Sequence, residues 1–107
     1  MNQQQKDRWI DALRSGEFKQ GRYKLKNNAN EYCCLGVLCI VENLEIDKDG
    51  YKLVTNIDDT YLIMTTLIGK NKNGEDFINT LIYMNDTENK NFNQIADYIE
   101  KEIPVTE

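Results

Sequence analysis

The most apolar stretch of this 107-residue sequence lies before its middle and reads Glu31-Tyr32-Cys33-Cys34-Leu35-Gly36-Val37-Leu38-Cys39-Ile40-Val41. Burying so many apolar side chains together is strongly favourable, so we expect this stretch at the centre of the core. A helix from about Cys34 to Asn43 would suit it, and a short strand through Tyr32 and Cys33 could precede the helix. Periodicity alone does not distinguish helix from strand in so short a run.

The segments around this stretch predict a helix and short hairpins. Asn2 can cap a first helix that ends near Arg14. Residues 23–26 alternate between apolar and basic side chains, which is typical of a half-buried strand. Residues 44–53 alternate in the same way on both sides of Asp47-Lys48-Asp49-Gly50, a sequence that favours a turn. We therefore expect one or two short antiparallel hairpins.

A third helix is expected after the hairpins. Asp58 and Asp59 both offer N-caps for it, and Gly69 can end it. Residues 70–74 read as a polar loop.

Two more helices are expected at the C-terminal end. A stripe of apolar residues at helical spacing begins at Phe77 and ends near Asn85. Asn91 can cap the last helix and Pro104 can end it. Because only residues 86–90 join these two helices, they should pack as an antiparallel pair.

Length and composition suit one globular domain, with 40% hydrophobic and 29% charged residues. We expect residues 1–107 to form a small single α+β domain with an N-terminal helix, the hairpins, a central apolar helix and the C-terminal helix pair. No apolar stretch precedes Trp9. We therefore expect neither a signal peptide nor a membrane anchor, and a cytoplasmic location.

The sequence contains no histidine, which removes the usual general base and the commonest metal ligand. Cys33, Cys34 and Cys39 form an odd set that suits a reducing compartment better than disulfides. Their apolar neighbours favour core packing over zinc ligation or nucleophilic catalysis. The paired acids of the chain fit turns and helix caps. We expect no metal, no cofactor and no enzymatic activity, and a small enzyme that uses acidic residues is the weakest alternative.

A basic loop after the first helix is the most suggestive polar segment. The predicted ligand-binding residues are Arg14, Lys19, Gln20 and Arg22 of this loop, together with Tyr32 from the apolar stretch. Guanidinium, ammonium and amide donors on a loop suit a phosphate or carboxylate ligand. Tyr23 or Tyr32 could stack on a base. An ordinary solvated loop is the alternative.

The charges divide the chain into two parts. Residues 1–41 carry a net charge of +3, and residues 42–107 carry −8. The acidic part could meet a basic cleft of a partner protein, with Glu75, Asp76 and Asp86 as predicted partner-binding residues. A total of −5 disfavours direct binding to nucleic acid.

Three blocks of the sequence resemble a family of short, mostly uncharacterised bacteriophage and prophage proteins. The blocks are Trp9 to Gly21 (Trp-x-x-Ala-Leu-Arg-Ser-Gly-x-x-x-Gln-Gly), Tyr32 to Cys39, and Met84-Asn85-Asp86 with Phe92-x-x-Ile95-Ala96-Asp97-Tyr98-Ile99-Glu100. The resemblance leaves residues 42–76 unmatched, and Ile40 stands where an acidic residue is common in the family. It implies a phage-derived accessory protein that acts in the bacterial cytoplasm.

Two binding functions follow from these observations. In the first, the protein binds and inhibits or modulates a bacterial host or defence protein without catalysing a reaction. In the second, it sequesters a nucleotide second messenger, with a site that could lie between subunits of a homo-oligomer.

Overall fold

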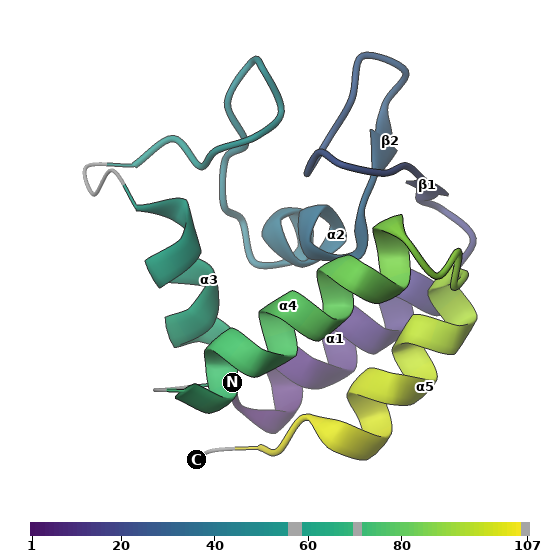
Figure 1. The fold of residues 1–107 in the computed structure, drawn as a ribbon, viewed down its shortest axis with the longest axis vertical. Coiled ribbons are helices and arrows are strands. Elements are labelled where there is room, and N and C mark those ends of the chain that lie inside the picture. Colours follow the sequence, from purple (N-terminus) through teal and green to yellow (C-terminus); the bar gives the residue numbers. More distant parts are fainter. Residues whose placement is uncertain (56–58, 70–71, 106–107) are drawn as a thin grey trace.

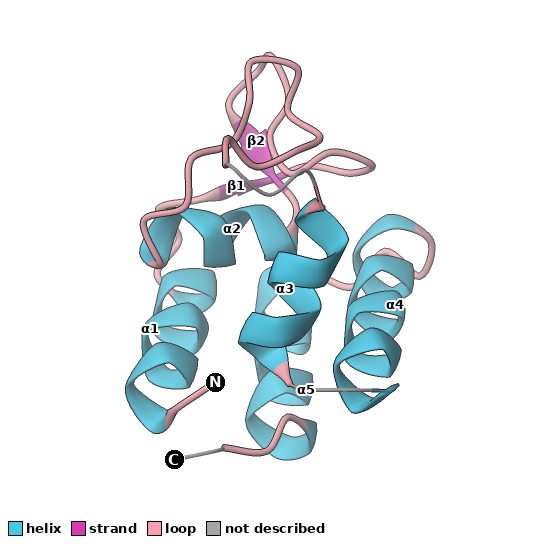
Figure 2. Cartoon of the chain, turned by 90° about the vertical axis from the view of Figure 1, so that its left-hand side faces the viewer, coloured by secondary structure: helices cyan, strands magenta, loops and turns pink. Residues whose placement is uncertain are grey.

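The computed structural model describes residues 1–55, 59–69 and 72–105, without the side chains of residues 72–75. This part of the chain contains five helices and two short strands. In chain order they are α1 (Gln3–Arg14), β1 (Lys19–Gln20), β2 (Glu31–Tyr32), α2 (Cys34–Val41), α3 (Thr60–Ile68), α4 (Lys72–Asp86) and α5 (Phe92–Glu102). Figures 1 and 2 show α2 lying across one end of the other four helices, with the strands and loops above it. The α+β class is confirmed. None of these helices has the length and apolar composition needed to cross a membrane.

The central apolar stretch forms α2, as predicted, and β2 precedes it. Cys33 caps the helix, with its Sγ accepting a hydrogen bond from the backbone N–H of Gly36 at 3.4 Å. Val37, Leu38 and Cys39 are fully buried. The helix ends two residues before the predicted Asn43, because Asn43 adopts a left-handed backbone with φ of 59°.

The predicted helix caps are confirmed. Asn2 caps α1, and its side chain accepts from the N–H of Gln5 while the Gln5 side chain accepts from the N–H of Asn2. Asn91 caps α5 through the same reciprocal pair of bonds. Asp59 caps α3, whereas Asp58 lies outside the described residues. These caps were predictable because each one involves only neighbouring residues.

The predicted antiparallel hairpins are wrong as strand pairs. The two-stranded sheet of the described residues is parallel, with Lys19 opposite Glu31. The predicted hairpin segments leave isolated antiparallel bridges, such as the one between Ile46 and Leu53. The backbone N–H of Leu25 donates to the carbonyl oxygen of Gly50 in the second loop at 2.8 Å. The N–H of Leu25 therefore bonds to the loop that contains Gly50 and does not pair strands within a hairpin.

Helix α4 begins at Lys72, so the predicted loop over residues 70–74 is wrong from residue 72 onwards. Residues 72–76 contain no apolar side chain. The apolar stripe that predicted this helix starts only at Phe77, and it could not reveal the first turn.

The two terminal helices pack closely on each other through polar and apolar contacts. The buried side chain of Lys6 in α1 donates from Nζ to the carbonyl oxygens of Glu100 at 3.0 Å and Ile103 at 2.7 Å. These carbonyls belong to the last turn of α5, where a cation is favourable. Helix α5 contacts α1 more extensively than it contacts α4, the partner that the sequence predicted. Figure 1 shows α4 and α5 running in opposite directions, as expected.

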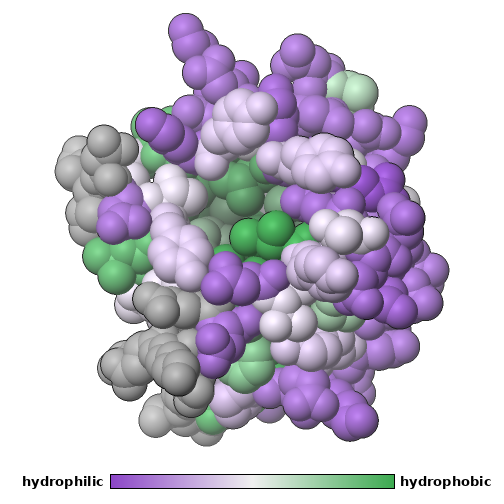
Figure 3. All heavy atoms as spheres, viewed as in Figure 1, coloured by the Kyte–Doolittle hydropathy of each residue, from purple (hydrophilic) through white to green (hydrophobic). Residues whose placement is uncertain are grey.

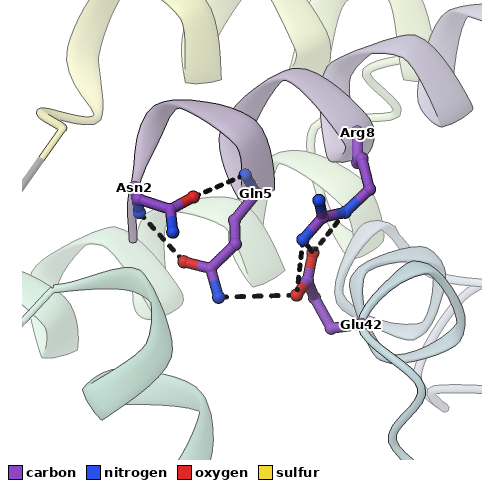
Figure 4. Close-up of polar contacts among 4 residues, drawn as sticks. All are labelled: Asn2, Gln5, Arg8 and Glu42. Carbon is purple, nitrogen blue, oxygen red and sulfur yellow. Dashed lines mark hydrogen bonds and ion pairs between the residues drawn. The ribbon is translucent and has the colours of Figure 1, made fainter. Parts of the chain in front are cut away.

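A second polar contact joins α1 to the end of α2 (Figure 4). Arg8 donates from Nε and Nη2 to the carboxylate of Glu42 at 3.0–3.2 Å, and Gln5 Nε2 donates to the same carboxylate at 3.4 Å. The side chain of Glu42 is largely buried while that of Arg8 is half exposed. A guanidinium that holds both oxygens of a carboxylate fixes the orientation of the two helices.

Replacement of Gly36 should strongly destabilise the fold, because an added Cβ would lie 1.9 Å from the backbone oxygen of Leu25. We expect Gly36→Ala to lower the free energy of unfolding by at least about 2 kcal/mol in urea denaturation, since the backbone must move to make room. Gly16→Ala is the control, because nothing lies within 4 Å of an added Cβ there. The only cost expected at this position is that of alanine in a left-handed backbone, about 1 kcal/mol. Equal losses for the two variants would contradict this account.

Candidate functional site

The fully buried side chain of Asn85, at the end of α4, joins three segments of the chain. Its Nδ2 donates to the carbonyl oxygen of Gly21 at 2.9 Å and to Oδ1 of Asp86 at 2.8 Å. Its Oδ1 accepts from Nε2 of Gln20 at 2.9 Å and from the backbone N–H of Cys34 at 3.2 Å. We call these groups the Asn85 junction. It fixes the strand loop and the start of α2 relative to α4.

The Asn85 junction also holds an exposed tyrosine in an unusual conformation. Tyr23 has a positive φ of 71°, which is rare for a large side chain. Its backbone N–H donates to Oδ1 of Asp86 at 3.1 Å, and 73% of the residue is exposed. Such strain persists only where the surroundings enforce it, and it concentrates at functional sites.

Tyr23 stands at the rim of a hollow of about 160 Å³. The floor of the hollow is apolar and includes Leu25 and Leu35, and its rim includes Tyr51 and Ile82. It also contains one basic and one acidic side chain, Lys24 and Asp86. We call it the charged hollow.

A second hollow of about 250 Å³ adjoins the first and shares four of its lining residues, Leu25, Leu35, Tyr51 and Ile82. Its other lining residues come from α3 and α4: Thr60, Tyr61, Met64 and Ile78. None of its lining residues is charged, so we call it the apolar hollow. Figure 3 shows a hydrophobic floor sunk between paler side chains on this face of the molecule.

The rim of the two hollows is unusually exposed for apolar and aromatic side chains. The exposed fractions are 56% for Tyr51, 43% for Tyr61 and 41% for Ile82. Tyrosine combines a large apolar ring with a polar tip and is enriched at binding surfaces. Clustered exposed residues of this kind indicate a binding surface, whereas isolated ones are ordinary.

The charged hollow contains one thiol, that of Cys33. Cys33 lies in its floor, and burial raises the pKa of its thiol to about 11 despite the nearby N–H of Gly36. The thiolate, which is the reactive form, is therefore scarce at neutral pH.

The ammonium of Lys24 lies 4.8 Å from the ring centre of Tyr51, a cation–π distance. Among the described residues, no three Cys, Asp or Glu gather closely enough to hold a metal ion.

Two of the predicted ligand-binding residues are engaged in ion pairs. Arg14 donates from Nη2 to Asp97 at 2.6 Å and to Glu100 at 3.3 Å, and the hydrogen bond to Asp97 raises the pKa of the guanidinium. Lys19 lies 3.5 Å from the carboxylate of Glu31. These cations already neutralise acids of the same chain.

The other three predicted ligand-binding residues point in different directions. Gln20 turns inward to the Asn85 junction. Tyr32 packs edge to face on Phe18, with ring centres 5.4 Å apart. Arg22 is exposed, next to Tyr23 in the chain. The five residues thus do not converge on one cavity, and their role in binding stays a prediction.

The predicted acidic residues are also dispersed. Asp76 is exposed on α4, and Asp86 belongs to the Asn85 junction. The side chain of Glu75 lies outside the described part of the structure. Their role in partner binding likewise stays a prediction.

Sequence reasoning missed the rim of the apolar hollow. A signal was available, because residues 60–68 carry no charge although several of them, including Tyr61 and Leu62, are exposed. An uncharged helix with exposed apolar residues is unusual on a protein surface. Asn85 gave no such signal, since three of its four partners lie far away in the sequence.

Comparison with known proteins places the first part of the chain in a family. Residues 1–73 match the family described as a domain of unknown function, DUF8296. The matched segment includes α1, both strands, α2 and α3. No curated protein and no solved structure matches the chain.

Loss of the Asn85 side chain should destabilise the protein, because it would remove the hydrogen bonds that the amide makes to the N–H of Cys34 and the carbonyl oxygen of Gly21. We expect Asn85→Ala to lower the free energy of unfolding by about 3 kcal/mol in urea denaturation. Asn79 is an exposed asparagine of the same helix, and Asn79→Ala should change stability by less than about 0.5 kcal/mol. A similar small effect at both positions would show that the junction is not structural.

The cysteines should resist alkylation in the folded protein. Burial raises the pKa of Cys33 to about 11 and that of Cys39 to about 12, and it raises the pKa of Cys34 well above its ordinary value. With iodoacetamide at pH 8, we expect labelling of the native chain to be roughly a hundredfold slower than in urea, measured by mass spectrometry. Rapid labelling of any one cysteine in the native protein would refute this.

Proposed function

The chain belongs to the DUF8296 family, a domain of unknown function, and we propose that it is a non-enzymatic binding protein whose apolar hollow receives a side chain of a bacterial partner protein. The observation that carries this proposal is the uncharged hollow of about 250 Å³ with Tyr51, Tyr61 and Ile82 exposed at its rim. Buried aromatic anchors surrounded by apolar contacts supply most of the energy of protein interfaces.

The energetics favour an apolar side chain as the group that enters this hollow. Full burial of a Leu or Phe side chain contributes about 1.5–3 kcal/mol, and no charged group of the hollow has to lose its water. A charged side chain would find no partner of opposite sign among the lining residues. The hollow thus favours apolar over charged side chains, because a charged group would lose its water without gaining a partner.

The resemblance to phage proteins supports a bacterial host or defence protein as the partner, bound in the cytoplasm and inhibited or modulated by the contact. The net charge of −8 over residues 42–107 would favour encounter with a basic surface. In this proposal the acidic residues raise the rate of association, and the apolar hollow supplies most of the affinity.

The proposal is tested by capture of partners from a bacterial lysate with matched variants. Ile82→Asp places a carboxylate at the rim of the hollow, and Tyr61→Ala removes its aromatic wall. We expect the double variant to lose proteins that the wild type retains, and to weaken binding of the purified partner at least tenfold, or about 1.4 kcal/mol. Circular dichroism would check that the variant is folded.

The control variant is Val54→Ala, an exposed apolar residue that does not line either hollow. It should retain the same proteins as the wild type. Retention of the same proteins by the double variant would refute the proposal. Loss of capture in 0.5 M salt, with no effect of the double variant, would instead assign the contact to charged residues such as Asp76.

A further inference from the structure

The charged hollow differs from the apolar hollow in offering two tyrosine rings and two opposite charges in a small space. Tyr23 and Tyr51 line it and are 73% and 56% exposed. Stacking of a base on an aromatic side chain contributes about 1–3 kcal/mol, and every base has a flat face for it. Because the backbone of Tyr23 is fixed by Asp86, less conformational freedom is lost when a ligand stacks on its ring.

The segment that carries Tyr23 is basic within an acidic protein. Residues 21–26 contain Arg22, Lys24 and Lys26 and no acid, while the whole chain has a net charge of −5. The flexible side chain of Lys24 ends over the ring of Tyr51 at the rim of the hollow. A base stacked on Tyr51 would displace this ammonium from the ring, and the long side chain of Lys24 would then reach a phosphate attached to the base.

The carboxylate of Asp86 completes the set of groups in the hollow. Its Oδ1 accepts from the N–H of Tyr23 and from Nδ2 of Asn85. A carboxylate has about four lone-pair positions on its two oxygens, so it can still accept an N–H from the edge of a base. Phosphate alone would be repelled by this charge and gain nothing from the rings.

From these groups we propose that the charged hollow binds a purine mononucleotide, with the base against Tyr23 and Tyr51 and the phosphate beside Lys24. A volume of about 160 Å³ is suited to a base and leaves the sugar and phosphate at the surface. Arg22 is exposed and precedes Tyr23 in the chain, so it adds positive charge to this segment. Nucleotide binding at this site does not require the protein partner, because Tyr61 and Met64 line only the other hollow.

Calorimetry on the purified full chain tests the proposal with AMP, GMP, adenosine, inorganic phosphate and phosphotyrosine at low salt. We expect AMP and GMP to bind, adenosine to bind about tenfold more weakly, and phosphate to give no heat. Raising the salt concentration to 0.3 M should weaken AMP and leave adenosine unchanged.

Two variants separate the roles of the ring and the cation. Tyr23→Asn removes the ring and keeps a residue that tolerates a left-handed backbone, so it should weaken AMP and adenosine alike by roughly tenfold. Lys24→Gln should weaken AMP about tenfold and leave adenosine unchanged. Lys48→Gln, an exposed lysine of another loop, is the control and should bind AMP like the wild type.

Several results would overturn the proposal. These are no heat with millimolar AMP or GMP, equal affinity for inorganic phosphate, tighter binding of phosphotyrosine than of AMP, or unchanged AMP binding by Tyr23→Asn. Tyr61→Ala should leave AMP binding unchanged while it weakens binding of the protein partner. Failure of nucleotide binding and failure of partner binding are therefore distinguishable.

Discussion

A single buried amide, that of Asn85, holds together parts of the chain that are far apart in sequence. It makes four hydrogen bonds, to Gln20, Gly21, Cys34 and Asp86, and it is fully buried. In a medium that excludes water, a satisfied amide of this kind fixes one arrangement, because every alternative leaves a polar group without a partner. The packing of α2 on α4 and the path of the loops above it depend on this amide.

The Asn85 junction gives a physical meaning to the sequence blocks that resemble phage proteins. Gln20-Gly21 comes from the first block, Cys34 from the second and Asn85-Asp86 from the third. The indole Nε1 of Trp9 donates to the carbonyl oxygen of Cys34 at 2.9 Å and links the first and second blocks again. These motifs therefore include the residues of a structural junction. The exposed rim of the apolar hollow beside it, with Tyr51, Tyr61 and Ile82, lies outside the blocks.

Features that depend on neighbouring residues could be predicted from the sequence, whereas features that depend on residues far apart in the sequence could not. The helices capped by Asn2, Asp59 and Asn91 were predicted because their caps are local. The parallel pairing of β1 with β2 was not predicted. The loop bonds that replace the hairpins join residues as distant in the sequence as Leu25 and Gly50. The predicted ligand site was a contiguous loop in the sequence. Some of its residues contact parts of the chain far away in sequence, as Gln20 does in bonding to Asn85, which no local pattern reveals.

The two proposed binding hollows would influence each other, because Tyr51 and Ile82 form walls of both. A ligand that displaces Lys24 from the ring of Tyr51 changes the surface that a partner side chain meets in the apolar hollow. By thermodynamic linkage, the factor by which a nucleotide alters the affinity for the partner must equal the factor by which the partner alters the affinity for the nucleotide. The short distance between the hollows makes this coupling a matter of direct contact, with no long-range change of fold required.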